Sequence, residues 1–100
     1  MPNVVDKYTP TYDLESFKKS RFEIKQSALI GAAALGFGRA EIHDAISNMT
    51  PQHFYKSMTS YSNHRIWQDV YHVPYKDLLL YIKFTQGTIT DFSLLSFKEK

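Results

Sequence analysis

The stretch FYKSMTSYSNHRIWQDVY, residues 54–71, organises the rest of this chain. Residues 54–58 form a short aromatic run, and residues 66–71 alternate with the period of two that a strand shows. The residues between these two runs are polar, which is typical of a loop. Because successive side chains of a strand point to opposite faces of a sheet, we expect Lys56 and Gln68 to meet on one face. The expected face carries Phe54, Lys56 and Met58 from the first strand and Ile66, Gln68 and Val70 from the second.

The composition fits one compact domain. One hundred residues, 43% of them apolar, suffice for one core and are too few for two, so we expect a single domain over residues 1–100. The absence of cysteine excludes disulfides and thiolate metal sites, and it is typical of a reducing compartment. No apolar run approaches the roughly 20 residues of a membrane span, and MPNVVDKYTP lacks the plan of a signal peptide. We therefore expect a soluble, unprocessed, cytoplasmic protein.

The charge is unevenly distributed. Residues 1–50 hold six cations and six anions, and residues 51–100 hold six cations and four anions, which gives the net charge of +2. This net positive charge is far smaller than that of a protein with the basic stripe needed for tight binding to a nucleic-acid duplex. A modest positive field can still steer a polyanion to a small site. Aromatic residues make up 15% of the chain, and they either fill the core or offer stacking platforms to bases.

The first half of the chain predicts an arm and then helices. Residues 1–12 contain two prolines and no periodicity, so they form an arm whose Tyr8 and Tyr12 can dock on the body. Asp13 is a suitable N-cap for a helix from Leu14 to about Arg21. The alternation over residues 22–25 predicts either a short strand or an extended connector.

Two further short helices follow, and we expect them to pack as a pair. Ser27 is the expected N-cap of a helix over residues 28–35, with Gly36 as its left-handed C-terminal residue. The next helix is indicated by an apolar stripe at i, i+3, i+4 and i+7, and Thr50 followed by Pro51 indicates one more turn. The stripe consists of Ile42, Ala45, Ile46 and Met49.

The second half predicts an antiparallel meander. Residues 72–77 contain Pro74 and are expected to form a loop, residues 78–85 are a strong strand candidate, and residues 88–98 return as the last strand after a turn at Gln86 and Gly87. Helices followed by an antiparallel sheet give an α+β domain, with the helices on the apolar face of the sheet. That face is expected to carry Leu80, Ile82, Phe84, Leu95 and Phe97.

The opposite face of the sheet is then free to bind a ligand. The alternation places Lys56, Gln68, Tyr81 and Lys98 there, one from each of four strands. Two amines, an amide and a phenol, without paired carboxylates, suit stabilisation of a phosphate better than hydrolysis of a sugar or peptide. RNA is the substrate that we expect, because its 2′-hydroxyl can attack the neighbouring phosphorus without a metal or an outside nucleophile. Lysine and tyrosine can share the proton transfers and the stabilisation of the phosphorane.

Three segments carry a resemblance to a known family. FYKSMTSYSNHRIWQDVY, SFKEK and SALIGAAALGFG are similar to segments of the motility quorum-sensing regulator (MqsR) toxins of type II toxin–antitoxin systems. The resemblance implies a RelE-like fold and a ribosome-independent mRNA interferase that acts on single-stranded mRNA without a cofactor. It further implies silencing by a cognate MqsA-like antitoxin, contact with DNA only through that antitoxin, and a part in growth regulation, persister formation and biofilms.

The resemblance also assigns roles to residues of this chain. The catalytic set that it implies consists of Lys56 in FYKSM, Gln68 in IWQDVY, Tyr81 in YIK and Lys98 in SFKEK, the same four residues that the alternation places on the open face. Further RNA contacts are expected from Tyr55, Met58, His64, Arg65 and Lys83. No metal site is expected, because the spacings of His53, His64 and His72 match no metal-binding template.

Simpler interpretations stand beside these assignments. From the pattern alone, Lys56 is a solvated strand residue and Lys98 is a charge of the C-terminal tail. Met58 is a packing residue and His64 is a solvated loop residue. A second class of function is a DNA-binding helix-turn-helix over residues 27–49, but its second helix contains Glu41 and Asp44, which repel phosphate. A third possibility is a noncatalytic protein-interaction module, which would tolerate conservative loss of Lys56 and Gln68.

Overall fold

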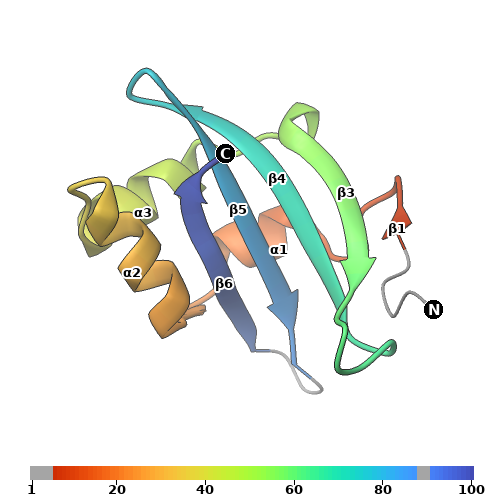
Figure 1. The fold of residues 1–100 in the computed structure, drawn as a ribbon. Coiled ribbons are helices and arrows are strands. Elements are labelled where there is room, and N and C mark those ends of the chain that lie inside the picture. Colours follow the sequence, from red (N-terminus) through yellow and green to blue (C-terminus); the bar gives the residue numbers. More distant parts are fainter. Residues whose placement is uncertain (1–5, 88–90) are drawn as a thin grey trace.

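Figure 1 shows an α+β fold in which a curved sheet is flanked by helices. The computed structural model describes residues 6–87 and 91–100. Within these residues the elements are β1 (Asp6–Lys7), α1 (Leu14–Lys19), β2 (Glu23–Ile24), α2 (Gln26–Ala34), α3 (Arg39–Ser47), the 3-10 turn η1 (Pro51–His53), β3 (Phe54–Thr59), β4 (Trp67–Tyr75), β5 (Leu78–Gln86) and β6 (Phe92–Glu99). The predicted fold class, helices followed by a mainly antiparallel sheet, is therefore confirmed.

The sheet has the strand order β1-β3-β4-β5-β6-β2. The four long strands form an antiparallel meander in sequence order, and β1 adds to β3 in antiparallel orientation. The short β2 pairs in parallel with β6 at the other edge, so residues 22–25 do contain a strand. A two-residue turn at Lys76 and Asp77, both with positive φ, joins β4 to β5 as expected for a tight hairpin.

The core lies between one face of the sheet and the helices. Figure 1 shows α1 behind the sheet, and its Phe17 ring stacks on Phe84 with centroids 3.8 Å apart and the planes 2° from parallel. The predicted apolar stripe is buried, since Ile42, Ala45 and Ile46 of α3 and Met49, just beyond its end, are at most 1% exposed. The side chains buried from the sheet include Tyr71, Val73, Leu80, Ile82, Phe84, Phe92, Leu94 and Phe97.

Helix α2 runs along β6 at one side of the sheet (Figure 1). The approach is so close that a Cβ added at Gly31 would collide with the backbone oxygen of Phe97, so the packing requires glycine there. Gly36 follows the helix with a φ of 81°, as the sequence predicts for a left-handed C-terminal residue. The predicted N-cap was wrong, because Lys25 occupies that position and the Ser27 hydroxyl instead donates to the backbone oxygen of Leu95 at 2.6 Å.

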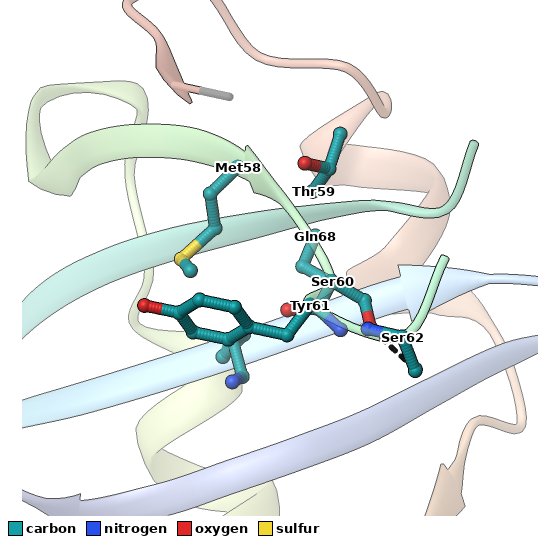
Figure 2. Close-up of a pocket in the computed structure, with 7 residues that line it drawn as sticks. Met58, Thr59, Ser60, Tyr61, Ser62 and Gln68 are labelled. Carbon is teal, nitrogen blue, oxygen red and sulfur yellow. Dashed lines mark hydrogen bonds between the residues drawn. The ribbon is translucent and has the colours of Figure 1, made fainter. Parts of the chain in front are cut away.

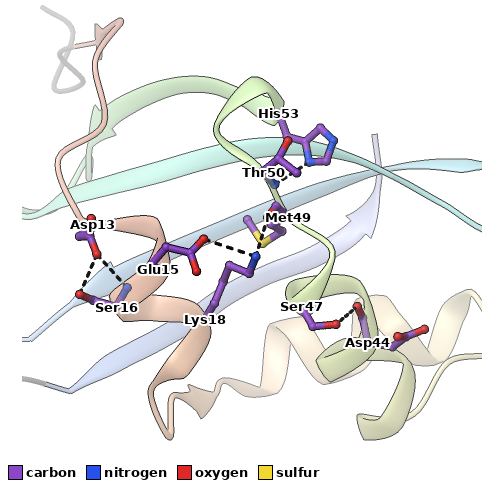
Figure 3. A network of polar contacts seen from close by, with 9 residues as sticks. All are labelled: Asp13, Glu15, Ser16, Lys18, Asp44, Ser47, Met49, Thr50 and His53. Carbon is purple, nitrogen blue, oxygen red and sulfur yellow. Dashed lines mark hydrogen bonds and ion pairs between the residues drawn. The ribbon is translucent and has the colours of Figure 1, made fainter.

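Polar contacts tie the ends of the helices together (Figure 3). Asp13 caps α1, as predicted, by accepting a hydrogen bond from the backbone N–H of Ser16 at 2.9 Å. The Lys18 ammonium donates to the backbone oxygen of Met49 at 2.8 Å, which anchors α1 to the segment that follows α3. The turn predicted at Thr50 and Pro51 is confirmed as η1, which leads directly into β3.

Two β-bulges change which side chains face the core. Between Phe54 and Lys56 the register with β4 shifts at Tyr55, so Phe54 pairs with Tyr71 and packs on the core, not beside Lys56 as predicted. In β6 the register shifts past Leu95, and Leu94 is fully buried while Leu95 is not. The prediction of Leu95 in the core was therefore wrong by one residue, because an inserted residue reverses the alternation.

The predicted loop over residues 72–77 was also wrong. Strand β4 continues through Pro74, which pairs with Leu79, and ends at Tyr75. The pairing of β3 with β4 ends at Tyr71, so the last residues of β4 are paired on one side and a proline is tolerated there. The predicted start of the last strand at residues 88–90 lies outside the described residues.

The arm adds β1 to the edge of the sheet, and its following residues dock on the core face at β4. The backbone N–H groups of Thr11 and Tyr12 donate to the buried Asp69 carboxylate at 2.9–3.1 Å. The predicted docking is confirmed for Tyr12, which packs against Phe84, whereas Tyr8 is 79% exposed.

Among the described residues, no helix has both the length and the apolar character needed to cross a bilayer.

Candidate functional site

The register places Lys56, Gln68, Tyr81 and Lys98 on the face of the sheet opposite α1. Lys56 pairs with Val70, two residues beyond Gln68 in β4, so the lysine and the glutamine share a face. Val70 in turn pairs with Lys83, two residues beyond Tyr81 in β5, and Tyr81 pairs directly with Lys98 in β6. Four consecutive strands therefore each bring one of the predicted catalytic residues to the same surface.

A row of rings crosses this surface. The Tyr55 ring stacks on His72 with centroids 4.2 Å apart, and His72 lies 6.1 Å from the Tyr81 ring. The bulge at Tyr55 places its ring at this position. The Lys98 ammonium completes the row at 5.1 Å from the centre of the Tyr81 ring, within the range of a cation–π contact. The Tyr81 ring therefore lies between the His72 imidazole and the Lys98 ammonium group.

Lys56 is oriented by an ion pair with the arm. Its ammonium lies 3.3 Å from the Asp6 carboxylate, and the lysine side chain is 23% exposed. The same ammonium lies 5.5 Å from the centre of the Tyr55 ring. Because β1 pairs with β3, the arm brings Asp6 to Lys56, and a ligand phosphate must compete with this carboxylate for the lysine.

Burial adjusts the acidity of two groups on this face. Partial burial raises the pKa of Tyr81 above its ordinary value, while the nearby Lys56 charge acts in the opposite direction. Burial lowers the pKa of Lys83, and the charge of Lys98 adds to that effect. Tyr81 therefore remains a protonated hydrogen-bond donor at neutral pH, surrounded by amines that stabilise negative charge.

A hollow of about 320 Å³ opens beside Gln68. Figure 2 shows the Met58 side chain directed toward the Tyr61 ring, with Gln68 to one side of Met58. The floor comes from β3, β4 and β5, and the wall comes from the loop that joins β3 to β4. The hollow is lined by Met58, Thr59, Ser60, Tyr61, Ser62, Gln68 and Lys83.

The structure does not gather all the predicted RNA contacts at one place. Tyr55, Met58 and Lys83 join the four-residue face or the adjoining hollow. Arg65 lines a separate hollow with Tyr12, and His64 lies on the exposed loop and lines neither hollow.

Sequence reasoning missed His72, Asp6 and Tyr61. His72 follows Gln68 and Val70 at the same period of two, so that period would have placed it on this face had Pro74 not suggested a loop. Nothing in the sequence indicated that Asp6 would reach the site, because its position depends on the pairing of a two-residue strand. Tyr61 was assigned only to a polar loop, and nothing in the sequence indicates how that loop folds.

The side chains on this face are of kinds that can bind a phosphate. Lys56, Lys83 and Lys98 supply positive charge, Gln68 an amide and Tyr81 a phenol. Among residues 6–87 and 91–100, no three histidine, aspartate or glutamate side chains gather in a way that could hold a metal ion. The groups on this face therefore offer charge stabilisation and proton donation to a bound phosphodiester.

Comparisons with known proteins give two findings. The family model described as "Motility quorum-sensing regulator, toxin of MqsA" matches residues 9–99. The chain is also 38% identical to the mRNA interferase toxin MqsR of Escherichia coli strain K12, over 96% of this chain and 100% of that protein. The family match extends across the four strands that form the open face.

Proposed function

The chain belongs to the motility quorum-sensing regulator (MqsR) toxin family, and we propose that the open face of its sheet is the site at which it cleaves mRNA. It is a toxin and an endoribonuclease, an mRNA interferase like its relative. The observation that carries the assignment of the site is the convergence of Lys56, Gln68, Tyr81 and Lys98 from four strands on one surface. We infer a sequence-selective, ribosome-independent activity on single-stranded mRNA.

The proposed reaction uses a nucleophile that the RNA itself provides. The 2′-oxygen loses its proton and bonds to the adjacent phosphorus while the bond from phosphorus to the 5′-oxygen breaks, and the 5′-oxygen gains a proton. The products are a 2′,3′-cyclic phosphate and a 5′-hydroxyl. Lys56 and Lys98 neutralise the charge that develops on the phosphoryl oxygens, and Gln68 positions the phosphate. Tyr81, which burial keeps protonated, donates a hydrogen bond to the same group.

We further propose that an MqsA-like antitoxin silences this chain. The matched family is described as the toxin of MqsA, which implies a dedicated protein partner. We place the action of the toxin in the cytoplasm, where bacterial mRNA is translated. Any contact with DNA is expected to be made by the antitoxin and not by the sheet of this chain.

The activity is tested on purified RNA in the presence of EDTA. We expect cleavage at defined positions, mapped by primer extension, with cyclic phosphate and 5′-hydroxyl ends. Lys56→Ala and Gln68→Ala should abolish cleavage, whereas Ile30→Ala, on an exposed position of α2, should cleave like the wild type. A 5′-phosphate end, or complete dependence on magnesium, would show that the proposed chemistry is wrong.

The toxin assignment has a separate test in cells. Expression without a partner should arrest growth, because bulk mRNA is the substrate, and the Lys56→Ala variant should not arrest it. Normal growth at a confirmed level of soluble wild-type protein would contradict the assignment.

A further inference from the structure

The hollow beside Gln68 has the size of a small-molecule site. Its volume of about 320 Å³ lies at the lower end of the roughly 300–1,000 Å³ that such sites occupy. It therefore suits one planar ring system better than a large ligand. Gln68 belongs both to this hollow and to the proposed catalytic face, so a ligand in the hollow lies next to the phosphate that is cleaved.

The lining combines apolar surfaces with polar groups at one edge. The Tyr61 ring and the Met58 thioether offer surfaces against which an aromatic ring can stack (Figure 2). The Gln68 amide both donates and accepts hydrogen bonds, and the Lys83 ammonium only donates. This combination suits a nucleobase, because a base presents aromatic faces for stacking and hydrogen-bonding groups along its edge.

The loop that carries Tyr61 is braced by its own hydrogen bonds. The backbone N–H of Ser60 donates to the backbone oxygen of Ile66 at 3.2 Å, which closes the loop at its base. Near the tip, the backbone N–H of Ser62 donates to the Ser60 hydroxyl oxygen at 3.1 Å. These bonds hold the wall of the hollow in place before a ligand arrives, which reduces the entropy lost on binding. Tyr61 itself is 72% exposed, so its ring is available to a ligand.

We propose that this hollow binds one unstacked nucleobase of the RNA, adjacent to the cleaved phosphate, with Tyr61 and Met58 against its faces and Gln68 and Lys83 at its edge. The proposal rests on the proposed RNA cleavage and deepens it. Single-stranded RNA is recognised by splaying out bases onto aromatic side chains, and the hollow offers this next to the phosphate site. Because Lys83 donates and does not accept, the bound base presents a hydrogen-bond acceptor to it. The hollow therefore contributes to the choice of cleavage sequence.

The test pairs a change in the protein with a change in the RNA. A short RNA that the wild type cuts at one position is compared with a series in which each base near the cut is removed in turn, leaving an abasic nucleotide. We expect Tyr61→Ala to lower kcat/KM on the intact RNA at least about fivefold, the loss typical of a missing base–aromatic stack. On the RNA that lacks the bound base, the same variant should cleave like the wild type, because no stack remains to be lost. Tyr61→Phe keeps the ring, so on the intact RNA it should lose less of kcat/KM than Tyr61→Ala does.

Two controls make the result specific. Tyr8→Ala removes a similarly exposed tyrosine that lines no part of the hollow, and it should leave the kinetics unchanged. The melting temperature of Tyr61→Ala should match that of the wild type, because its side chain is largely exposed. Wild-type kinetics in Tyr61→Ala, or the same loss on every abasic RNA, would overturn the nucleobase site while leaving RNA cleavage intact. An inert wild type would overturn the proposed function and the nucleobase site together.

Discussion

Lys98 and Tyr81 pair across β5 and β6, and the lysine ammonium lies 5.1 Å from the centre of the tyrosine ring. On its other side the Tyr81 ring faces His72, at 6.1 Å between centroids. The ring is thus held by neighbours on two strands, while its hydroxyl is the part available for chemistry. Removing the hydroxyl oxygen of Tyr81 can therefore separate the role of the ring in packing from the role of the hydroxyl in the reaction.

Tyr81→Phe is the first prediction. The variant keeps the ring, its contact with Lys98 and its neighbour His72, and deletes only the hydroxyl that we assign to the phosphate. We expect single-turnover cleavage to slow at least about tenfold, equivalent to roughly 1.4 kcal/mol in the barrier. Thermal unfolding of the same preparation should be unchanged. Wild-type rates would reduce Tyr81 to a packing residue.

The second prediction concerns the ion pair between Asp6 and Lys56. The carboxylate lies 3.3 Å from the ammonium, so it competes with the RNA phosphate for the lysine. Asp6→Asn should lower KM by a few fold, because a partly exposed pair contributes about 0.2–1 kcal/mol. The effect should shrink as salt is added, since salt screens the competing charge.

The control for Asp6→Asn is the same change at Asp77, in the turn at the opposite end of β4. Asp77→Asn removes the same charge without touching Lys56, so it measures the effect of net charge alone. An equal fall in KM in both variants would show that the ion pair has no specific role.

The third prediction separates the two faces of the sheet. Phe84 is fully buried and stacks on Phe17, so Phe84→Ala should cost about 3–5 kcal/mol of unfolding free energy. Lys98 is exposed, so Lys98→Ala should shift stability by no more than about 0.5 kcal/mol while it reduces cleavage strongly. Urea unfolding and cleavage rates measured on both variants provide the comparison. A large stability loss in Lys98→Ala would contradict the assignment of that face to binding.

Sequence reasoning succeeded where the alternation of side chains is regular. Lys56 and Gln68 lie on uninterrupted stretches of β3 and β4, and Ile82 and Phe84 alternate with Lys83 in β5, so their faces follow from the period of two. The stripe of α3 was equally clear, because its period of about 3.6 residues extends from Ile42 to Met49.

The errors arose where a local feature interrupted that period. A bulge at Tyr55 turns Phe54 toward the core, and another at Leu95 exchanges its burial with that of Leu94. Neither residue type marks a bulge, so the sequence carried no signal for it. Pro74 gave a false signal, because proline excludes a central strand but not a stretch paired on one side.

The last prediction uses the environment of His72. Burial lowers the pKa of this imidazole below its ordinary value of 6.5, and the charge of Lys100 adds to the effect. The folded chain therefore binds fewer protons at His72 than the unfolded chain does, so stability is lost as the pH falls below 6.5. The other side chains that face His72 are the rings of Tyr55 and Tyr81, with centroids 4.2 and 6.1 Å away.

His72→Phe should remove this pH dependence while keeping a ring for Tyr55 to stack on. We expect the unfolding free energy of the wild type, relative to that of the variant, to decrease as the pH is lowered from 8 to 5. Urea unfolding of both proteins measures this difference. His43, His53 and His64 are present in both proteins, so their contributions cancel in the difference. Parallel stability curves would show that folding leaves the affinity of His72 for protons unchanged, and a rise in relative stability toward pH 5 would show that the imidazole is stabilised in its charged form.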